Sequence, residues 1–153
     1  MIDQSILKEA AIREIAKRLS KKAGPNLVEK VIRALLLLEG LCQSGQPFTF
    51  KGGTAVMLLL SQPRRFSIDI DIITEDTDCL TRTFDKITKE KSFTSWEPQK
   101  RADKGGLSKS HFKFFYQPAN GSGIDNEYVL LDIVIKKSEY NTTQKARFNS
   151  VFN

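Results

Sequence analysis

The sequence has few of the residues that build thiolate metal sites or cysteine-based active sites. It contains two cysteines, Cys42 and Cys79, and one histidine, His111. No Cys-x-x-Cys pair or cysteine–histidine ligand spacing occurs, so no zinc site is expected. Two cysteines without a secretory leader predict reduced thiols and a cytoplasmic location. No serine or cysteine arrangement accompanies the lone histidine, which is therefore predicted to be incidental rather than catalytic.

Long hydrophobic segments are also missing. The longest apolar runs, Ala34–Leu38 and Ala55–Leu60, are far shorter than the roughly 20 residues that span a bilayer, so no membrane partner is expected. The formal net charge is +6, and such an excess suits a partner that carries phosphates, although many basic proteins bind no nucleic acid. The length predicts one domain over residues 1–153.

The hydrophobic pattern predicts an α/β (α+β) domain, with a small mixed sheet flanked by helices and two helices at the N-terminus. We expect helices over about Gln4–Lys22, Leu27–Cys42, Ala55–Ser61 and Cys79–Lys91. We expect strands over Phe48–Phe50, Phe66–Ile73, Thr94–Glu97, His111–Gln117 and Glu127–Lys137. The second helix is apolar on most of its surface and should be largely buried.

A glycine pair and a hydroxyl residue, Gly52, Gly53 and Thr54, stand between a β-prone segment and a short apolar helix. Glycine lets the backbone turn sharply and lets a ligand approach closely. The N–H groups and positive dipole end of the helix attract anions, and Thr54 can either cap the helix or donate to a phosphate oxygen. The segment predicts a binding site for a nucleotide triphosphate or, alternatively, a tight strand–helix connection. It is not a Walker loop, because the GxxxxGK[ST] spacing is absent.

Two aspartates one residue apart alternate with isoleucines: Ile68, Asp69, Ile70, Asp71 and Ile72. On a strand, the isoleucines would face the core and both aspartates would face the other way. Two carboxylates on one face repel each other, and a divalent cation such as Mg²⁺ would offset that repulsion. The alternative is a solvated strand face with Arg64 and Arg65 as counter-ions.

Asp132 is the one acidic residue inside a later apolar strand pattern. A charge among apolar neighbours is costly unless it is paired or bound to a metal. If this strand lies beside the Phe66–Ile73 strand, Asp132 could join Asp69 and Asp71 as a third ligand or as a general base. Otherwise it belongs to an edge strand and faces solvent.

The stretch FKGGTAVMLLLSQPRRFSIDIDII, at residues 50–73, resembles the signature of AbiEii-type nucleotidyltransferases. These are toxin components of type IV toxin–antitoxin and phage-defence systems. Their pattern is an apolar residue, GG and Thr or Ser, a short helix, and then R-x-S-x-D-x-D. The matching residues are Gly52, Gly53, Thr54, Arg65, Ser67, Asp69 and Asp71, and Asp132 matches the third acidic position.

The resemblance implies transfer of a nucleotidyl group from a nucleoside triphosphate to an acceptor hydroxyl, with tRNA as the acceptor, Mg²⁺ or Mn²⁺ as cofactor and a cognate antitoxin as partner. It assigns Asp69, Asp71 and Asp132 to catalysis and metal binding. It assigns nucleotide binding to Gly52, Gly53, Thr54, Arg65 and Ser67. Such proteins continue through a helical C-terminal half with a Lys-x-x-x-Asp-type motif, which residues 1–153 lack.

Two other functions compete with this one. The chain could be a catalytically silent nucleotide- or RNA-binding module, in which case Mg²⁺-dependent triphosphate binding would occur without turnover. It could also be a glycosyltransferase that holds a sugar nucleotide through its Asp-x-Asp motif and a metal. The upstream Gly-Gly-Thr segment argues against the glycosyltransferase, because that chemistry does not call for this order of motifs.

Overall fold

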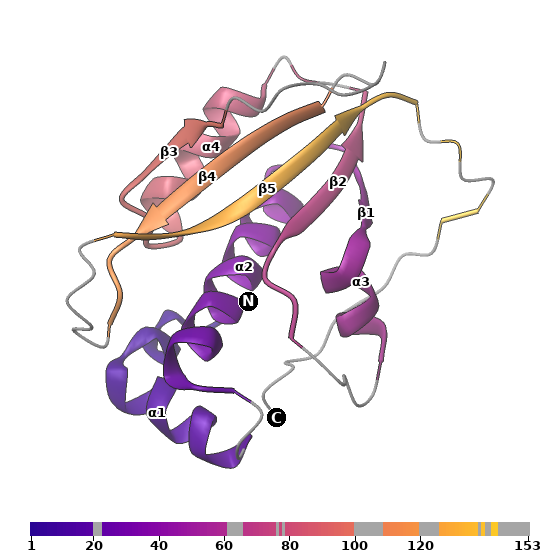
Figure 1. Ribbon diagram of the computed structural model, residues 1–153. Coiled ribbons are helices and arrows are strands. Elements are labelled where there is room, and N and C mark those ends of the chain that lie inside the picture. The colour runs from indigo at the N-terminus through magenta and orange to yellow at the C-terminus, as the bar shows by residue number, and fades with distance from the viewer. Residues whose placement is uncertain are drawn as a thin grey trace.

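The computed structural model describes residues 1–19, 23–60, 66–75, 77, 79–99, 109–119, 126–137, 139, 142 and 143. The described part of the chain forms a five-stranded sheet with helices packed against it (Figure 1). Its helical elements are the 3-10 helix η1 (Gln4–Leu7), α1 (Glu9–Arg18), α2 (Pro25–Gln43), α3 (Gly52–Leu59) and α4 (Leu80–Glu90). Its strands are β1 (Thr49–Lys51), β2 (Ile70–Thr74), β3 (Ser95–Pro98), β4 (Lys109–Tyr116) and β5 (Glu127–Ile135).

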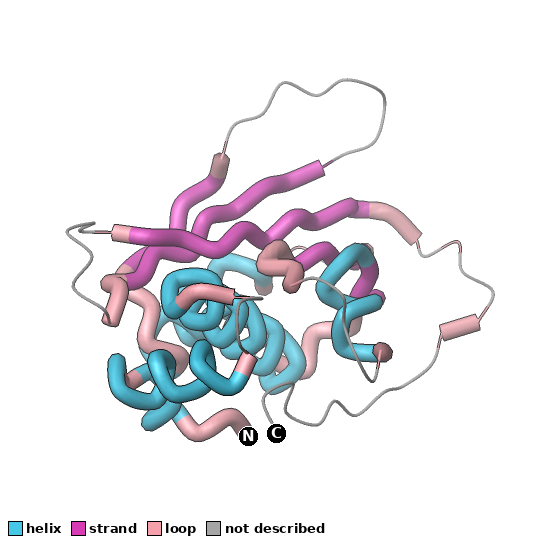
Figure 2. Tube along the Cα trace, turned by 60° about the horizontal axis from the view of Figure 1, so that its bottom comes forward, coloured by secondary structure: helices cyan, strands magenta, loops and turns pink. Residues whose placement is uncertain are grey.

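The last strand in the sequence, β5, lies in the middle of the sheet. The strand order is β1-β2-β5-β4-β3, with β2 and β5 parallel and the other neighbouring pairs antiparallel. The described helices lie on one side of this sheet (Figure 2). A mixed sheet with helices, two of them at the N-terminus, confirms the predicted α/β (α+β) class.

Alternating side chains of the central strands build the core. Ile70 and Ile72 of β2 are fully buried with Leu131 of β5, and they pack in one cluster with α2 and α4. A second cluster lies between α1 and α2. Because α2 contributes to both clusters, most of its residues are buried, as its apolar surface predicted.

The predicted strand Phe66–Ile73 is wrong at its start. Regular pairing begins only at Ile70, opposite Leu131, and continues to Thr74. On the other side of β2, the pairing with β1 reaches only as far as Asp71, because the chain of β1 turns into α3 at Gly52. Residues 66–69 therefore have no ladder partner among the described strands, and Asp69 precedes the strand instead of sharing it with Asp71.

Two helix boundaries also differ from the prediction. The helix predicted over Gln4–Lys22 is divided, because Lys8 adopts an extended conformation between η1 and α1. The Asp3 side chain accepts the Ser5 N–H, which favours the separate short turn. The third helix begins at Gly52 rather than at Ala55, so the glycine pair belongs to its first turn.

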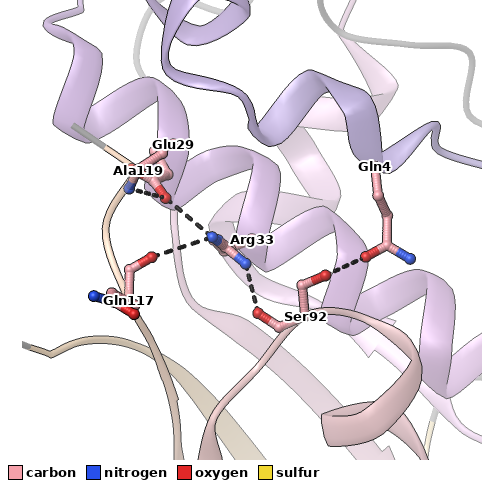
Figure 3. Close-up of polar contacts among 6 residues, drawn as sticks. All are labelled: Gln4, Glu29, Arg33, Ser92, Gln117 and Ala119. Carbon is pink, nitrogen blue, oxygen red and sulfur yellow. Dashed lines mark hydrogen bonds and ion pairs between the residues drawn. The ribbon is translucent and has the colours of Figure 1, made fainter. Parts of the chain in front are cut away.

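A buried ion pair ties α2 to the strand ends below the sheet (Figure 3). Arg33 donates to Glu29 on the same helix, to the Ser92 carbonyl after α4 and to the Gln117 carbonyl after β4. Glu29 also accepts the N–H of Ala119. Both charged side chains are almost fully buried. This cluster fixes where α2 lies under the sheet.

Cys42 and Cys79 are both free and exposed. Among the described helices, none has the length and apolar character needed to cross a membrane.

Candidate active site

Four polar side chains stand in one row across the sheet. Lys51 on β1 stands opposite Asp71 on β2. Asp71 in turn stands opposite Asp132 on β5, and Asp132 stands opposite His111 on β4. Asp71 lies between the buried Ile70 and Ile72, so it points away from the core. We call Lys51, Asp71, Asp132 and His111 the polar row; all four side chains are partly buried.

The two carboxylates occupy the centre of the row, and each has a partner on its outer side. The Lys51 Nζ lies 3.8 Å from Asp71 Oδ1, and the His111 Nδ1 lies 2.7 Å from Asp132 Oδ1. Side chains directly opposite on paired strands have Cβ atoms about 4.5–5.5 Å apart, so Asp71 and Asp132 are close neighbours. The strand of Asp132 does lie beside the strand of Asp71, which was the condition for these two aspartates to act together.

The environment of Asp71 disfavours its charged form. Burial raises the pKa of this carboxyl, the Lys51 charge lowers it, and the Asp132 charge raises it again, with a net increase above the ordinary value. A carboxylate pair whose charge is incompletely balanced by the protein attracts a cation.

The glycine pair leaves space for Asp71 and Ser67, which belong to the second half of the same sequence motif. Gly52 has a φ of 80°, and a Cβ there would collide with the Asp71 carboxylate. A Cβ on Gly53 would lie 2.9 Å from the Ser67 hydroxyl oxygen. Gly52 and Gly53 therefore let the first turn of α3 lie directly against Asp71 and Ser67.

Thr54 joins α3 to the residue before β2. Its side chain is buried, and its hydroxyl donates to the Asp69 carbonyl at 2.6 Å. The alternative that Thr54 caps the helix is wrong, because the N-cap residue is Lys51 and it forms no side-chain cap. The threonine hydroxyl thus holds the Asp69 backbone beside the first turn of α3.

The remaining predicted site residues lie around this turn. Asp69 is exposed and precedes β2, and Ser67 is partly buried, with its N–H directed to the Met57 sulfur at 3.5 Å. Arg65, predicted to contact the triphosphate, lies outside the described residues, as does Arg64. Of the three predicted acidic residues, the sheet register pairs Asp71 with Asp132.

The polar row contains two carboxylates that could serve as ligands of a cation. Within the described ranges, no three His, Cys, Asp or Glu side chains form a group that could hold a metal ion. Mg²⁺ is usually bound through one or two carboxylates, with waters and substrate phosphates completing its six ligands. Asp71 and Asp132 fit that mode of binding. That Asp69 binds the metal together with them stays a prediction.

Lys51 and His111 are the members of the row that were not assigned to the site from the sequence, and His111 was predicted to be incidental. Its neighbours Phe112 and Phe114 alternate with it, and Phe114 is buried, so the pattern alone places His111 on the opposite face. The pattern does not show that Asp132 stands opposite it. That information lies in the register between β4 and β5.

The sequence matches the model of a known protein family. The model of the family described as "Nucleotidyl transferase AbiEii toxin, Type IV TA system" matches residues 36–152. Among solved structures, the crystal structure of JHP933 from Helicobacter pylori is similar at 18% sequence identity with a TM-score of 0.44. That match covers 76% of this chain and 44% of the Helicobacter protein, so the chain spans less than half of that protein's length. No curated protein matches the sequence.

Proposed function

Because this chain belongs to the AbiEii family of nucleotidyl transferase toxins of type IV toxin–antitoxin systems, we propose that it is a metal-dependent nucleotidyltransferase. It would move a nucleotidyl group from a nucleoside triphosphate to an acceptor hydroxyl, with tRNA as the acceptor. A cognate antitoxin protein would be its partner in the cytoplasm. The observation that supports this most strongly is the register that places Asp71 beside Asp132 next to the first turn of α3.

Asp71 and Asp132 would hold Mg²⁺ or Mn²⁺, with Asp69 at the edge of the site. When bound, the ion would neutralise charge on the triphosphate and on the leaving pyrophosphate. The acceptor hydroxyl would attack the α-phosphate in line, and the side chains would act by positioning and by charge.

The start of α3 would bind the triphosphate. The backbone N–H groups of its first turn have no acceptor within the helix. Because Gly52 and Gly53 have no Cβ, this turn lies close to the carboxylates. Lys51, immediately before this turn, adds a positive charge 3.8 Å from Asp71. Arg65 and Ser67 would add further contacts to the phosphates.

The test is transfer of label from each of the four α-³²P-labelled nucleoside triphosphates to bulk tRNA in Mg²⁺. We expect Asp71→Ala and Asp132→Ala to reduce transfer at least about 100-fold, since each removes a charge that stabilises the transition state. Glu127→Gln is the matched control, because Glu127 is a carboxylate on the same strand as Asp132 but pairs with Lys30. Its transfer should equal that of the unmodified chain.

Two results would contradict the proposal. Full transfer by Asp71→Ala and Asp132→Ala would show that the site is elsewhere. Tight Mg²⁺-dependent binding of the triphosphates with no transfer to any RNA or protein acceptor would identify a nucleotide-binding module instead.

A further inference from the structure

His111 forms the shortest contact in the polar row. Its Nδ1 lies 2.7 Å from Asp132 Oδ1, whereas the Lys51 ammonium lies 3.8 Å from Asp71. The first distance is that of a strong hydrogen bond, and the second is that of a loose ion pair. The two carboxylates are therefore held in different ways.

The direction of this hydrogen bond follows from its acceptor. An ionised carboxylate can only accept, so the Nδ1 atom of His111 carries the proton. An imidazole can donate this bond while it is neutral, whereas an ammonium group always brings a positive charge. His111 can thus fix the orientation of Asp132 without cancelling the negative charge that a cation needs.

The ring itself is held in place. The His111 side chain is 14% exposed, and its residue lies opposite Asp132 inside the longest ladder of the sheet. On the other side of β4, the His111 carbonyl accepts the Gln99 N–H at 2.7 Å. Because His111 stands inside a paired strand and its own carbonyl is hydrogen-bonded to Gln99, its ring is a firm support for the carboxylate.

We propose that His111 is a positioning residue for Asp132, and this rests on the proposed function of the polar row. The ring donates to Oδ1 of Asp132 and leaves Oδ2 to the divalent cation. Partners of this kind orient metal-binding side chains, and their loss typically weakens metal binding 10- to 100-fold.

The first experiment measures Mn²⁺ affinity of the untagged chain, without nucleotide, by electron paramagnetic resonance. We expect His111→Ala to weaken Mn²⁺ binding about 10-fold or more, and His111→Asn to restore it to within about threefold, since an Asn amide can donate from nearly the same place as Nδ1. Lys113→Gln is the matched control, because Lys113 is the next residue on the same face of β4 but lies over the Tyr128 ring. It should leave Mn²⁺ affinity undiminished.

A second experiment observes the ring directly. His111 is the one histidine of the sequence, so long-range ¹H–¹⁵N spectra of the untagged protein report a single imidazole. We expect Nδ1 to be protonated at pH 8, and the Nε2-protonated tautomer to dominate in Asp132→Ala. An unprotonated Nδ1 in the unmodified chain would overturn the proposal.

Failure of this inference can be distinguished from failure of the proposed function. If Asp132→Ala abolishes Mn²⁺ binding but His111→Ala does not weaken it, His111 has no positioning role and the metal site stands. If Asp71→Asn and Asp132→Ala both bind Mn²⁺ as the unmodified chain does, the metal site itself is wrong and the role of His111 falls with it.

Discussion

Gly52 determines how closely α3 approaches the carboxylates. Its φ of 80° disfavours any side chain, and a Cβ would also meet the Asp71 carboxylate. We expect Gly52→Ala to lower the free energy of unfolding by about 1–2 kcal/mol for the backbone conformation alone, with a further loss from the collision. Metal binding and nucleotidyl transfer should fall at the same time, because Asp71 must move.

Gly45 provides a matched control for this substitution. It has a similar φ of 76°, but a Cβ there would meet no atom within 4 Å. In parallel urea unfolding, Gly45→Ala should therefore lower the free energy of unfolding only by the part due to the backbone conformation. It should leave Mn²⁺ binding intact. Equal effects of the two substitutions on stability and on Mn²⁺ binding would refute the contact with Asp71.

Site residues could be predicted from the sequence where they belong to a short sequence pattern. The spacing of Gly52, Asp71 and their neighbours singles out the motif, and the apolar surroundings of Asp132 single out that carboxylate. The position of His111 was not predictable, because it depends on which residue of β5 stands opposite it. The pattern also could not show that the glycine pair makes room for Asp71 and Ser67.

Helix α2 is held by a buried charge pair that joins three parts of the chain. Replacing Arg33 with Met would leave the Glu29 carboxylate, 1% exposed, without its counter-ion. We expect Arg33→Met to lower the free energy of unfolding by about 3–5 kcal/mol in urea titrations, since one partner of a buried pair is removed. Metal binding by the remaining folded protein should change little, because the cluster does not touch the polar row.

The neighbouring Lys30 tests whether burial causes this loss. Lys30 also makes an ion pair, with Glu127 at 2.7 Å, but both side chains are about one quarter exposed. Lys30→Met should therefore lower the free energy of unfolding by only about 0–1 kcal/mol. A loss as large as that of Arg33→Met would refute the argument from burial.

Helices and strands could be predicted from the sequence where a single hydrophobic periodicity runs through the whole segment. The apolar surface of α2 and the alternation in β5 both carry this signal, and both elements lie where the sequence places them. Boundaries were wrong where tertiary contacts decide them. β2 begins at Ile70 because that is where pairing with β5 begins, and α3 begins at Gly52 because Asp71 and Ser67 pack against its first turn.

For the molecule as a whole, the ionised form of one member of the polar row, Asp71, reduces stability. The raised pKa of Asp71 means that its ionised form is less favourable in the folded than in the unfolded chain. Ionised Asp71 therefore opposes folding at neutral pH, and this opposition is lost as the pH falls through the raised pKa toward the ordinary value of 3.8. We expect Asp71→Asn to raise the melting temperature at pH 7 without divalent cations, and the gain to shrink at lower pH.

This prediction is checked by thermal unfolding at a series of pH values. Glu75→Gln is the control for loss of one negative charge, because Glu75 is exposed just after β2. At pH 7, the melting temperature of Glu75→Gln should differ less from that of the unmodified chain than the melting temperature of Asp71→Asn does. A lower melting temperature for Asp71→Asn than for the unmodified chain at pH 7 would contradict the prediction.

The topology of the sheet was beyond the reach of the sequence. Each strand pattern is local, whereas the order β1-β2-β5-β4-β3 depends on how all five strands share one core. A mixed sheet was predictable from alternating helices and strands. The insertion of β5 between β2 and β4 was not, because many registers bury the same apolar alternation.

This central place of β5 has a consequence for the newly synthesised protein. The glycine pair, Asp69 and Asp71 are made early, but Asp71 has no second carboxylate beside it until residues 127–135 have left the ribosome. Closing so long a loop is also a slow step, since distant segments must meet before any contact rewards them. A nascent chain of this family thus carries its whole signature motif before Asp71 has its partner carboxylate, and the polar row is complete only when β5 has been inserted.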